Sequence, residues 1–198
     1  PDLRENQLKR WAASELHRLR SELELSSSVL DAAWQAVAGD ASLRRYFRLS
    51  TPQASYICMD SPQQAGDVAL FMSLANRLRE AEVHAPKIFA IETLKGFLLL
   101  EDFGELMFKQ LLTIESGQQL FDCIMPVLAK LARCDSAELP DYSVAKLQAE
   151  LDLFPQWYVA PRTGLPAESL LEDRRWQQFC RLLTEQATGQ PQVLVHRD

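Results

Sequence analysis

Cysteine, histidine and glycine are scarce in this chain of 198 residues, which contains four, three and seven of them. The cysteines are widely spaced and lie in apolar segments, so they indicate neither a zinc cluster nor a redox pair, and we expect reduced thiols in the core. No histidine has a second histidine or a cysteine one helical turn away. The sequence therefore predicts no metal site built from these residue types.

Long apolar runs and an excess of positive charge are also missing. No apolar run reaches the roughly 20 residues of a transmembrane helix, and the charged N-terminal segment lacks the apolar centre of a signal peptide, so we expect a soluble, cytoplasmic protein. The chain has 21 Lys and Arg against 27 Asp and Glu, a formal net charge of −6. Because nucleic acids and anionic membranes bind basic patches, we expect neither as a partner. As to oligomeric state, we favour a monomer.

Hydrophobic residues make up 47% of the chain, enough for the core of one large domain or of two lobes. In the first hundred residues, helical spacing of apolar positions predicts an amphipathic helix from Arg4 to Leu23 and a second helix from Val68 to Leu78, capped by Asp67. Apolar runs bounded by turn residues predict five strands. These are Ala36–Ala38, Tyr46–Leu49, Tyr56–Met59, Ile88–Ile91 and Phe97–Leu100.

Beyond Gly104 the pattern becomes mostly helical. Three helices are expected: Leu120–Leu131 with a kink at Pro126, Val144–Phe154 ended by Pro155, and a helix from Ser169, in a capping box with Glu172, to the break at Gly189. The segment Ala160–Ala167, with two prolines and a glycine, is predicted to be a surface loop. Val193–Val195 is a strand-like run at the end of the chain.

The segment Gly39-Asp40-Ala41-Ser42 joins the first two predicted strands. Small residues let backbone amides and a hydroxyl approach phosphate oxygens without a clash at Cβ. An ordinary hairpin turn has the same composition, but Arg44, Arg45 and Arg48 follow at once, and guanidinium groups can offset the charge of a triphosphate. Strand alternation puts Arg45 on one face and Arg44 and Arg48 on the other.

Two apolar runs end in acidic residues that can carry chemistry. Phe97–Leu100 leads into Glu101-Asp102-Phe103-Gly104. This segment resembles the hinge of a kinase fold, where backbone groups can hydrogen-bond an adenine edge and a carboxylate can reach a ribose. Val193–Val195 leads into His196-Arg197-Asp198. This run resembles the strand that, in kinase-fold phosphotransferases, delivers an aspartate to the cleft, where its carboxylate accepts the proton of a substrate hydroxyl as phosphate is transferred.

Five motifs occur in a fixed order along the chain. They are Gly39-Asp40-Ala41-Ser42-x-Arg44-Arg45-Tyr46-Phe47-Arg48, Met59-Asp60-Ser61-Pro62, Leu98-Leu99-Leu100-Glu101-Asp102-Phe103-Gly104, Leu153-Phe154-Pro155-x-Trp157-Tyr158 and Val195-His196-Arg197-Asp198. Together they resemble the aminoglycoside phosphotransferase-like family of kinase-fold enzymes, and most of all its bacterial branch of anomeric N-acetylmuramate/N-acetylglucosamine kinases. The likeness runs from about Trp34 to Asp198.

The resemblance implies an α+β, bilobal, protein-kinase-like fold. Residues 1–103 would form an N-terminal nucleotide-binding lobe with a leading helix and a five-stranded antiparallel sheet, and residues 104–198 a mostly helical C-terminal lobe. It also implies ATP-dependent phosphorylation of the anomeric hydroxyl of an amino sugar in cell-wall sugar recycling, with nucleotide and sugar as the partners.

Residue roles follow from the same resemblance. Asp198 would be the catalytic base, residues 39–42 would cover the phosphates, and Glu101, Asp102 and Phe103 would hold the nucleoside. The family's catalytic-loop asparagine and its aspartate ligand for Mg²⁺ are expected downstream of Asp198, so this chain is expected to hold no complete metal site. We therefore expect a fragment with an incomplete C-terminal lobe and little or no activity of its own.

The chain departs from the wider kinase pattern at the phosphates. The predicted strand over residues 56–60 has no lysine, and the following helix has no glutamate in its middle to pair with one. We hypothesise that Arg44, Arg45 or Arg48 takes over the role of that lysine.

Candidate sugar ligands are Glu150, Trp157 and Arg197, because carboxylates accept hydrogen bonds from hydroxyls, aromatic faces pack on pyranose rings and a guanidinium can meet an acidic sugar substituent. For Trp157 a core role is about equally well supported. Two other functions stay open. One is a kinase for another small alcohol, such as an aminoglycoside, choline or homoserine, and the other is a nucleotide-binding pseudokinase without activity.

Overall fold

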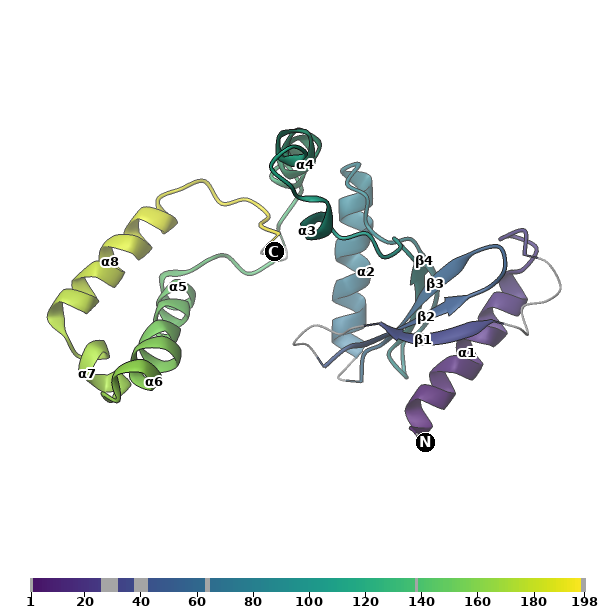
Figure 1. The fold of residues 1–198 in the computed structure, drawn as a ribbon, viewed down its shortest axis with the longest axis horizontal. Helices are drawn as coiled ribbons and strands as arrows, with labels where there is room; N and C mark the ends of the chain where they lie inside the picture. Colours follow the sequence, from purple (N-terminus) through teal and green to yellow (C-terminus); the bar gives the residue numbers. More distant parts are fainter. Residues whose placement is uncertain (1, 26–31, 38–42, 63–64, 138, 197–198) are drawn as a thin grey trace. The chain divides into compact units, whose positions relative to one another are not determined.

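The computed structural model describes residues 2–25, 32–37, 43–62, 65–137 and 139–196 (Figure 1). The chain divides into two compact units, Pro1–Leu131 and Ala132–Asp198. The sequence predicts a division at residue 104, where strands give way to helices, whereas the first compact unit continues through Leu131. Among the described residues no helix is long and apolar enough to cross a membrane.

The first unit is built on a five-stranded antiparallel sheet, as the sequence predicts. Its strands are β1 (Ala33–Val37), β2 (Arg45–Ser50), β3 (Ser55–Asp60), β4 (Ile88–Glu92) and β5 (Phe97–Glu101), in the spatial order β1-β2-β3-β5-β4. Strand β1 begins three residues before its predicted start at Ala36, and Ala38 lies outside the described residues. The α+β class is therefore confirmed.

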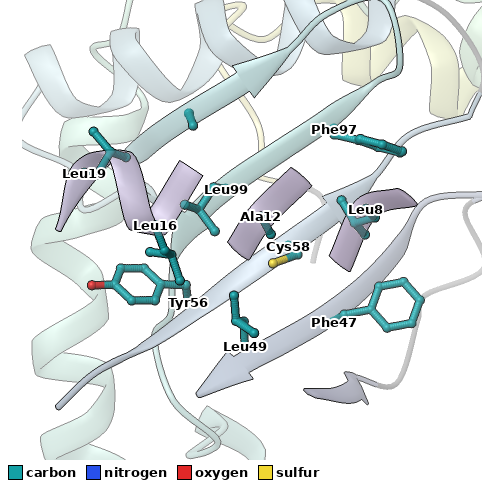
Figure 2. Packing of buried hydrophobic residues seen from close by; sticks show 11 residues of the cluster. Leu8, Ala12, Leu16, Leu19, Phe47, Leu49, Tyr56, Cys58, Phe97 and Leu99 are labelled. Atoms are coloured by element: carbon teal, nitrogen blue, oxygen red, sulfur yellow. The ribbon is translucent and has the colours of Figure 1, made fainter. Parts of the chain in front are cut away.

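Helix α1 (Leu3–Leu19) covers one face of this sheet. Its buried positions Leu8, Ala12 and Leu16 are spaced by four residues, which puts them on one side of the helix. They pack against alternate residues of the strands, so one continuous cluster forms (Figure 2). Its strand residues are Phe47, Leu49, Tyr56, Cys58, Ala90, Phe97 and Leu99. The helix ends at Leu19 and turns follow, so it is shorter than the predicted span to Leu23.

Helix α2 (Ala65–Glu80) covers the opposite face (Figure 1). There Val68 packs with Met59, Leu98 and Leu100. Because β5 is covered on both faces, its residues from Phe97 to Leu100 are all buried, which explains their unbroken apolar run. The helix begins two residues before Asp67, so that residue lies in the first turn and not at the predicted capping position.

An ion-pair network ties the start of α1 to the end of β3, the central strand of the sheet. Asp60, at the end of β3, is fully buried and accepts hydrogen bonds from Arg4 Nε at 2.7 Å and from Arg45 Nη2 at 2.6 Å. Arg45 also pairs with Asp2, which caps α1. Gly96 lies in the turn between β4 and β5, and its backbone carbonyl accepts a hydrogen bond from the Ser61 amide at 2.8 Å.

Two helices complete the first unit. They are α3 (Phe108–Leu111) and α4 (Gly117–Leu131), and Pro126 lies inside α4, where a kink stays a prediction. The side chain of Lys130 in α4 pairs with Glu82, just after α2, at 3.0 Å.

The second unit is helical. It contains α5 (Val144–Leu151), the π-helix η2 (Pro155–Val159), α6 (Ala160–Thr163), α7 (Ala167–Leu171) and α8 (Arg174–Thr188), and α5 packs against α8.

Two predictions about helix ends and one about a loop are wrong in this unit. Pro155 does not end the helical segment but occupies the first position of η2, where the missing N–H costs no hydrogen bond. Part of the predicted loop Ala160–Ala167 is helical, as α6. The long helix α8 starts after Asp173, not at Ser169, because the Asp173 carboxylate accepts from the amides of Arg175 and Trp176.

The strand predicted at Val193–Val195 is wrong as well. Residues 191–196 form no regular secondary structure, and no described strand pairs with them. An extended apolar run needs a neighbouring strand for its backbone hydrogen bonds, so apolar composition alone does not make it a strand.

Candidate functional site

A pocket of about 360 Å³ lies on the α2 face of the sheet in the first unit. This volume is within the range of small-molecule sites. Its walls come from the sheet, from α2 and from the segment after β5. The lining residues are Val37, Tyr46, Arg48, Ile57, Phe71, Pro86, Leu100, Glu101, Asp102, Phe103 and Gly104. The walls are mostly apolar, and the polar groups gather at the end formed by residues 101–104.

The sheet register explains how Arg48 reaches that end. Arg48 stands opposite Ile57, and Ile57 stands opposite Leu100, so these three residues form one row across β2, β3 and β5. Asp102 follows Leu100 by two residues. The Arg48 side chain therefore crosses β3, and its guanidinium group binds the Asp102 carboxylate through two hydrogen bonds. Nε donates to Oδ2 at 2.6 Å and Nη2 donates to Oδ1 at 3.0 Å.

This ion pair is shielded from water, since the Arg48 and Asp102 side chains are 13% and 2% exposed. Burial alone would raise the pKa of Asp102, but hydrogen bonds from Arg48, from the Ser55 hydroxyl and from the Gly104 amide outweigh it, so the pKa lies below its ordinary value. The same pairing raises the pKa of Arg48. Both groups are therefore charged at neutral pH.

Glu101 is held separately, at the edge next to β4. Its carboxylate accepts from the Lys87 amide at 3.0 Å and lies 3.1 Å from His84 Nε2, and its own amide donates to the Lys87 carbonyl at 2.8 Å. Burial would raise the pKa of Glu101, but the Lys87 amide and His84 lower it overall. The His84 ring also lies against the Phe103 ring, with centroids 4.6 Å apart. No hydrogen bond joins the Phe103 backbone to another residue in the described part of the chain.

The three arginines of the β2 region are separated by the sheet, as strand alternation predicts. Arg45 faces α1, where Asp2 and Asp60 bind it. Arg48 lines the pocket on the other face. Arg44 lies on this second face too, with its guanidinium carbon 5.9 Å from the ring centre of Phe71, a pocket residue. These contacts favour a structural role for Arg45 and leave Arg44 and Arg48 beside the pocket.

The β3 strand has no lysine on the pocket face; Met59 lies there instead and is fully buried against Val68. The residues predicted to cover the phosphates, Gly39, Asp40, Ala41 and Ser42, lie outside the described residues. The predicted base Asp198 and its neighbour Arg197 also lie outside them. Their roles stay predictions. No group of three or more His, Cys, Asp or Glu side chains that could hold a metal ion occurs in the described part of the chain.

The other sugar-ligand candidates belong to the second unit. Glu150 pairs with Lys146 at 3.3 Å and lines a pocket of about 370 Å³ between α5 and α8, together with Leu147 and Thr184. Trp157 lies on η2 and is 77% exposed, so the core alternative for this residue is wrong. Its neighbour Tyr158 stacks on Phe154, with ring centres 5.2 Å apart.

Sequence reasoning missed several wall residues of the first pocket: Val37, Tyr46, Ile57, Phe71 and Pro86. Each belongs to a predicted element or turn, but its place in the pocket depends on strand register. Tyr46 and Arg48 are two residues apart on one strand and therefore lie on the same face of the sheet. This was the one signal in the sequence that could have placed Tyr46 in the pocket.

A five-stranded antiparallel sheet with α1 on one face and α2 on the other is the architecture of the smaller lobe of a kinase-like fold. The chain belongs to the phosphotransferase enzyme family, whose family model matches residues 33–198.

Curated relatives with detailed names are similar to this chain. A Pseudomonas putida protein named N-acetylmuramate/N-acetylglucosamine kinase is 35% identical over 198 residues, which is 100% of this chain and 58% of the relative. Proteins of the same name from Pseudomonas aeruginosa and Neisseria meningitidis are 40% and 32% identical over 164 and 168 residues, and these alignments cover 81% of this chain and 48% and 49% of the relatives. The chain thus spans about half the length of these relatives.

Proposed function

We propose that the protein is an ATP-dependent kinase of N-acetylmuramate and N-acetylglucosamine that phosphorylates the anomeric hydroxyl in the cytoplasm. The observation that carries this proposal is the alignment of the whole chain with the P. putida kinase of that name. The pocket on the α2 face supports it, because its size and apolar walls suit a planar base.

Different residues of the described chain would contact the adenine and the phosphates of the nucleotide. Val37, Ile57 and Leu100 would pack on the faces of the adenine, while the Phe103 backbone would hydrogen-bond its edge. Arg44, on the pocket face near Phe71, would meet the phosphates, which assigns the role of the missing lysine to Arg44 and not to Arg45. Mg²⁺ would supply neutralisation of phosphate charge.

For the sugar, we propose contacts from the second unit. The exposed Trp157 ring would pack on a pyranose face, and the Glu150 carboxylate would accept from sugar hydroxyls. Asp198 would accept the proton of the anomeric hydroxyl and Arg197 would meet an acidic substituent. The aligned enzyme would thus work by positioning and by charge neutralisation more than by covalent chemistry.

ADP release by the full-length protein, measured against a panel of acceptors, tests this proposal. N-acetylmuramate and N-acetylglucosamine should be turned over, whereas an aminoglycoside, choline and homoserine should not. Phosphorylation at the anomeric position should also abolish the reducing-sugar reaction of the product. Asp198→Asn is the control and should remove turnover while ATP binding is kept.

Two results would replace the proposal with its alternatives. Turnover of another alcohol in preference to both amino sugars would indicate a different small-molecule kinase. ATP binding without turnover of any acceptor would indicate a pseudokinase.

A further inference from the structure

Arg48 contacts both ends of the short segment that would meet the adenine. It binds Asp102 through two hydrogen bonds, and Nη2 also donates to the Gly104 carbonyl at 3.0 Å. Nη1 pairs with Glu105. One guanidinium group on β2 therefore holds residues before and after Phe103.

The carboxylate of Asp102 is fully used inside this arrangement. It accepts two bonds from Arg48, one from the Gly104 amide at 2.9 Å and one from the Ser55 hydroxyl. A carboxylate has about four acceptor positions, so no position is left for a ribose hydroxyl. The hydrogen bond that the Gly104 amide donates to Asp102 closes a turn around Phe103, and the φ of +83° at Gly104 is a conformation that glycine adopts without strain.

We propose that Arg48 is a positioning residue for the nucleotide, which fixes residues 102–105 so that the Phe103 backbone is presented to the adenine edge, and that Asp102 serves this clamp and not the ribose. This inference rests on the proposed function. It differs from direct phosphate binding by Arg48, because the clamp acts on the base. Loss of the clamp should therefore weaken binding of adenosine and of ATP alike.

Affinities of the full-length protein for adenosine and for ATP, measured by calorimetry, separate the two roles. Arg48→Lys keeps the charge but loses the bidentate fork, and Asp102→Asn keeps the shape but loses the ion pair. Each should raise both dissociation constants by about tenfold, equivalent to about 1.4 kcal/mol, and should raise KM for ATP while kcat changes by less than about twofold. Arg175→Lys is the matched control, because Arg175 also makes a two-pronged contact, with Asp173, but in an exposed position, and neither constant should change.

Arg44→Ala is the comparison for a residue that contacts the phosphates. It should weaken the binding of ATP and leave the binding of adenosine unchanged. If the Arg48 variant behaves in that way, or if it changes neither affinity, the positioning role is refuted. If the unsubstituted protein binds neither ligand, the proposed function itself fails.

A measurement without substitutions covers the case in which the variants do not fold. Adenosine should slow hydrogen exchange at the amides of residues 102–105 in the unsubstituted protein. Bound adenosine without slower exchange in that segment would overturn the inference.

Discussion

Replacement of Asp60 should release the start of α1 from the sheet. The buried carboxylate binds Arg4 and Arg45 at 2.7 and 2.6 Å. Asp60→Ala would leave two guanidinium groups facing each other without the anion between them. Removing one partner of a fully buried ion pair costs about 3–5 kcal/mol. The two arginine side chains are 34% and 38% exposed and can turn to water, so we expect a loss of about 2–3 kcal/mol in the free energy of unfolding.

Urea unfolding of the full-length protein gives the size of this effect, and hydrogen exchange gives its location. Amides of α1 should exchange faster in Asp60→Ala, because the helix loses its anchor at the end of β3. Glu15→Gln is the matched control, because it breaks the ion pair with Arg18, whose side chain is 62% exposed. That substitution should cost less than about 0.5 kcal/mol.

Two results would show that Asp60 does not anchor α1: a cost for Asp60→Ala no greater than that for Glu15→Gln, or unchanged exchange in α1 while the protein loses stability. The first result would mean that water replaces the carboxylate at little cost. The second would mean that apolar packing alone holds α1 on the sheet.

Three further outcomes are expected. Gly96→Ala should cost at least about 2 kcal/mol in thermal unfolding, because φ is +70° and an added Cβ would lie 2.1 Å from the Ser61 carbonyl oxygen; no loss would show that this turn can rearrange. Leu16→Ala should cost about 3 kcal/mol in urea unfolding, because it empties a fully buried position under α1, and a loss below about 1 kcal/mol would show that the cluster collapses onto the gap. The lowered pKa of Asp102 means that this carboxylate contributes stability above its unfolded pKa of about 3.9 and loses it as the pH falls through the lower folded pKa. Between about pH 5 and pH 3 the urea midpoint should therefore fall more steeply in the unsubstituted protein than in Asp102→Asn, and equal slopes would contradict the ion pair with Arg48.

The sequence predicts the five strands and helices α1, α2 and α4 of the first unit because each carries a periodic signal, but it misses the four-residue helix α3. The alternation in β2 separates Arg45 from Arg48, and the structure confirms this. The unbroken apolar run of β5 is also informative, since a strand covered on both faces has no polar side.

The sequence fails where two local signals compete or where a distant partner decides. Ser169 and Asp173 are both good helix caps, and only the packed structure selects Asp173. Composition predicts a strand at residues 193–195, but no described strand pairs with it. The Arg48–Asp102 pair joins residues 54 positions apart, so it depends on the register of β2, β3 and β5 and has no local signal.

Photolabelling with an azido derivative of ATP tests the central claim, that the pocket on the α2 face holds the adenine. The full-length protein would be labelled, digested and analysed by mass spectrometry. Label is expected on Tyr46 or within residues 97–104, and excess ATP should suppress it. Label that ATP suppresses only in peptides from residues 144–188, or label that ATP does not suppress anywhere, would contradict the claim.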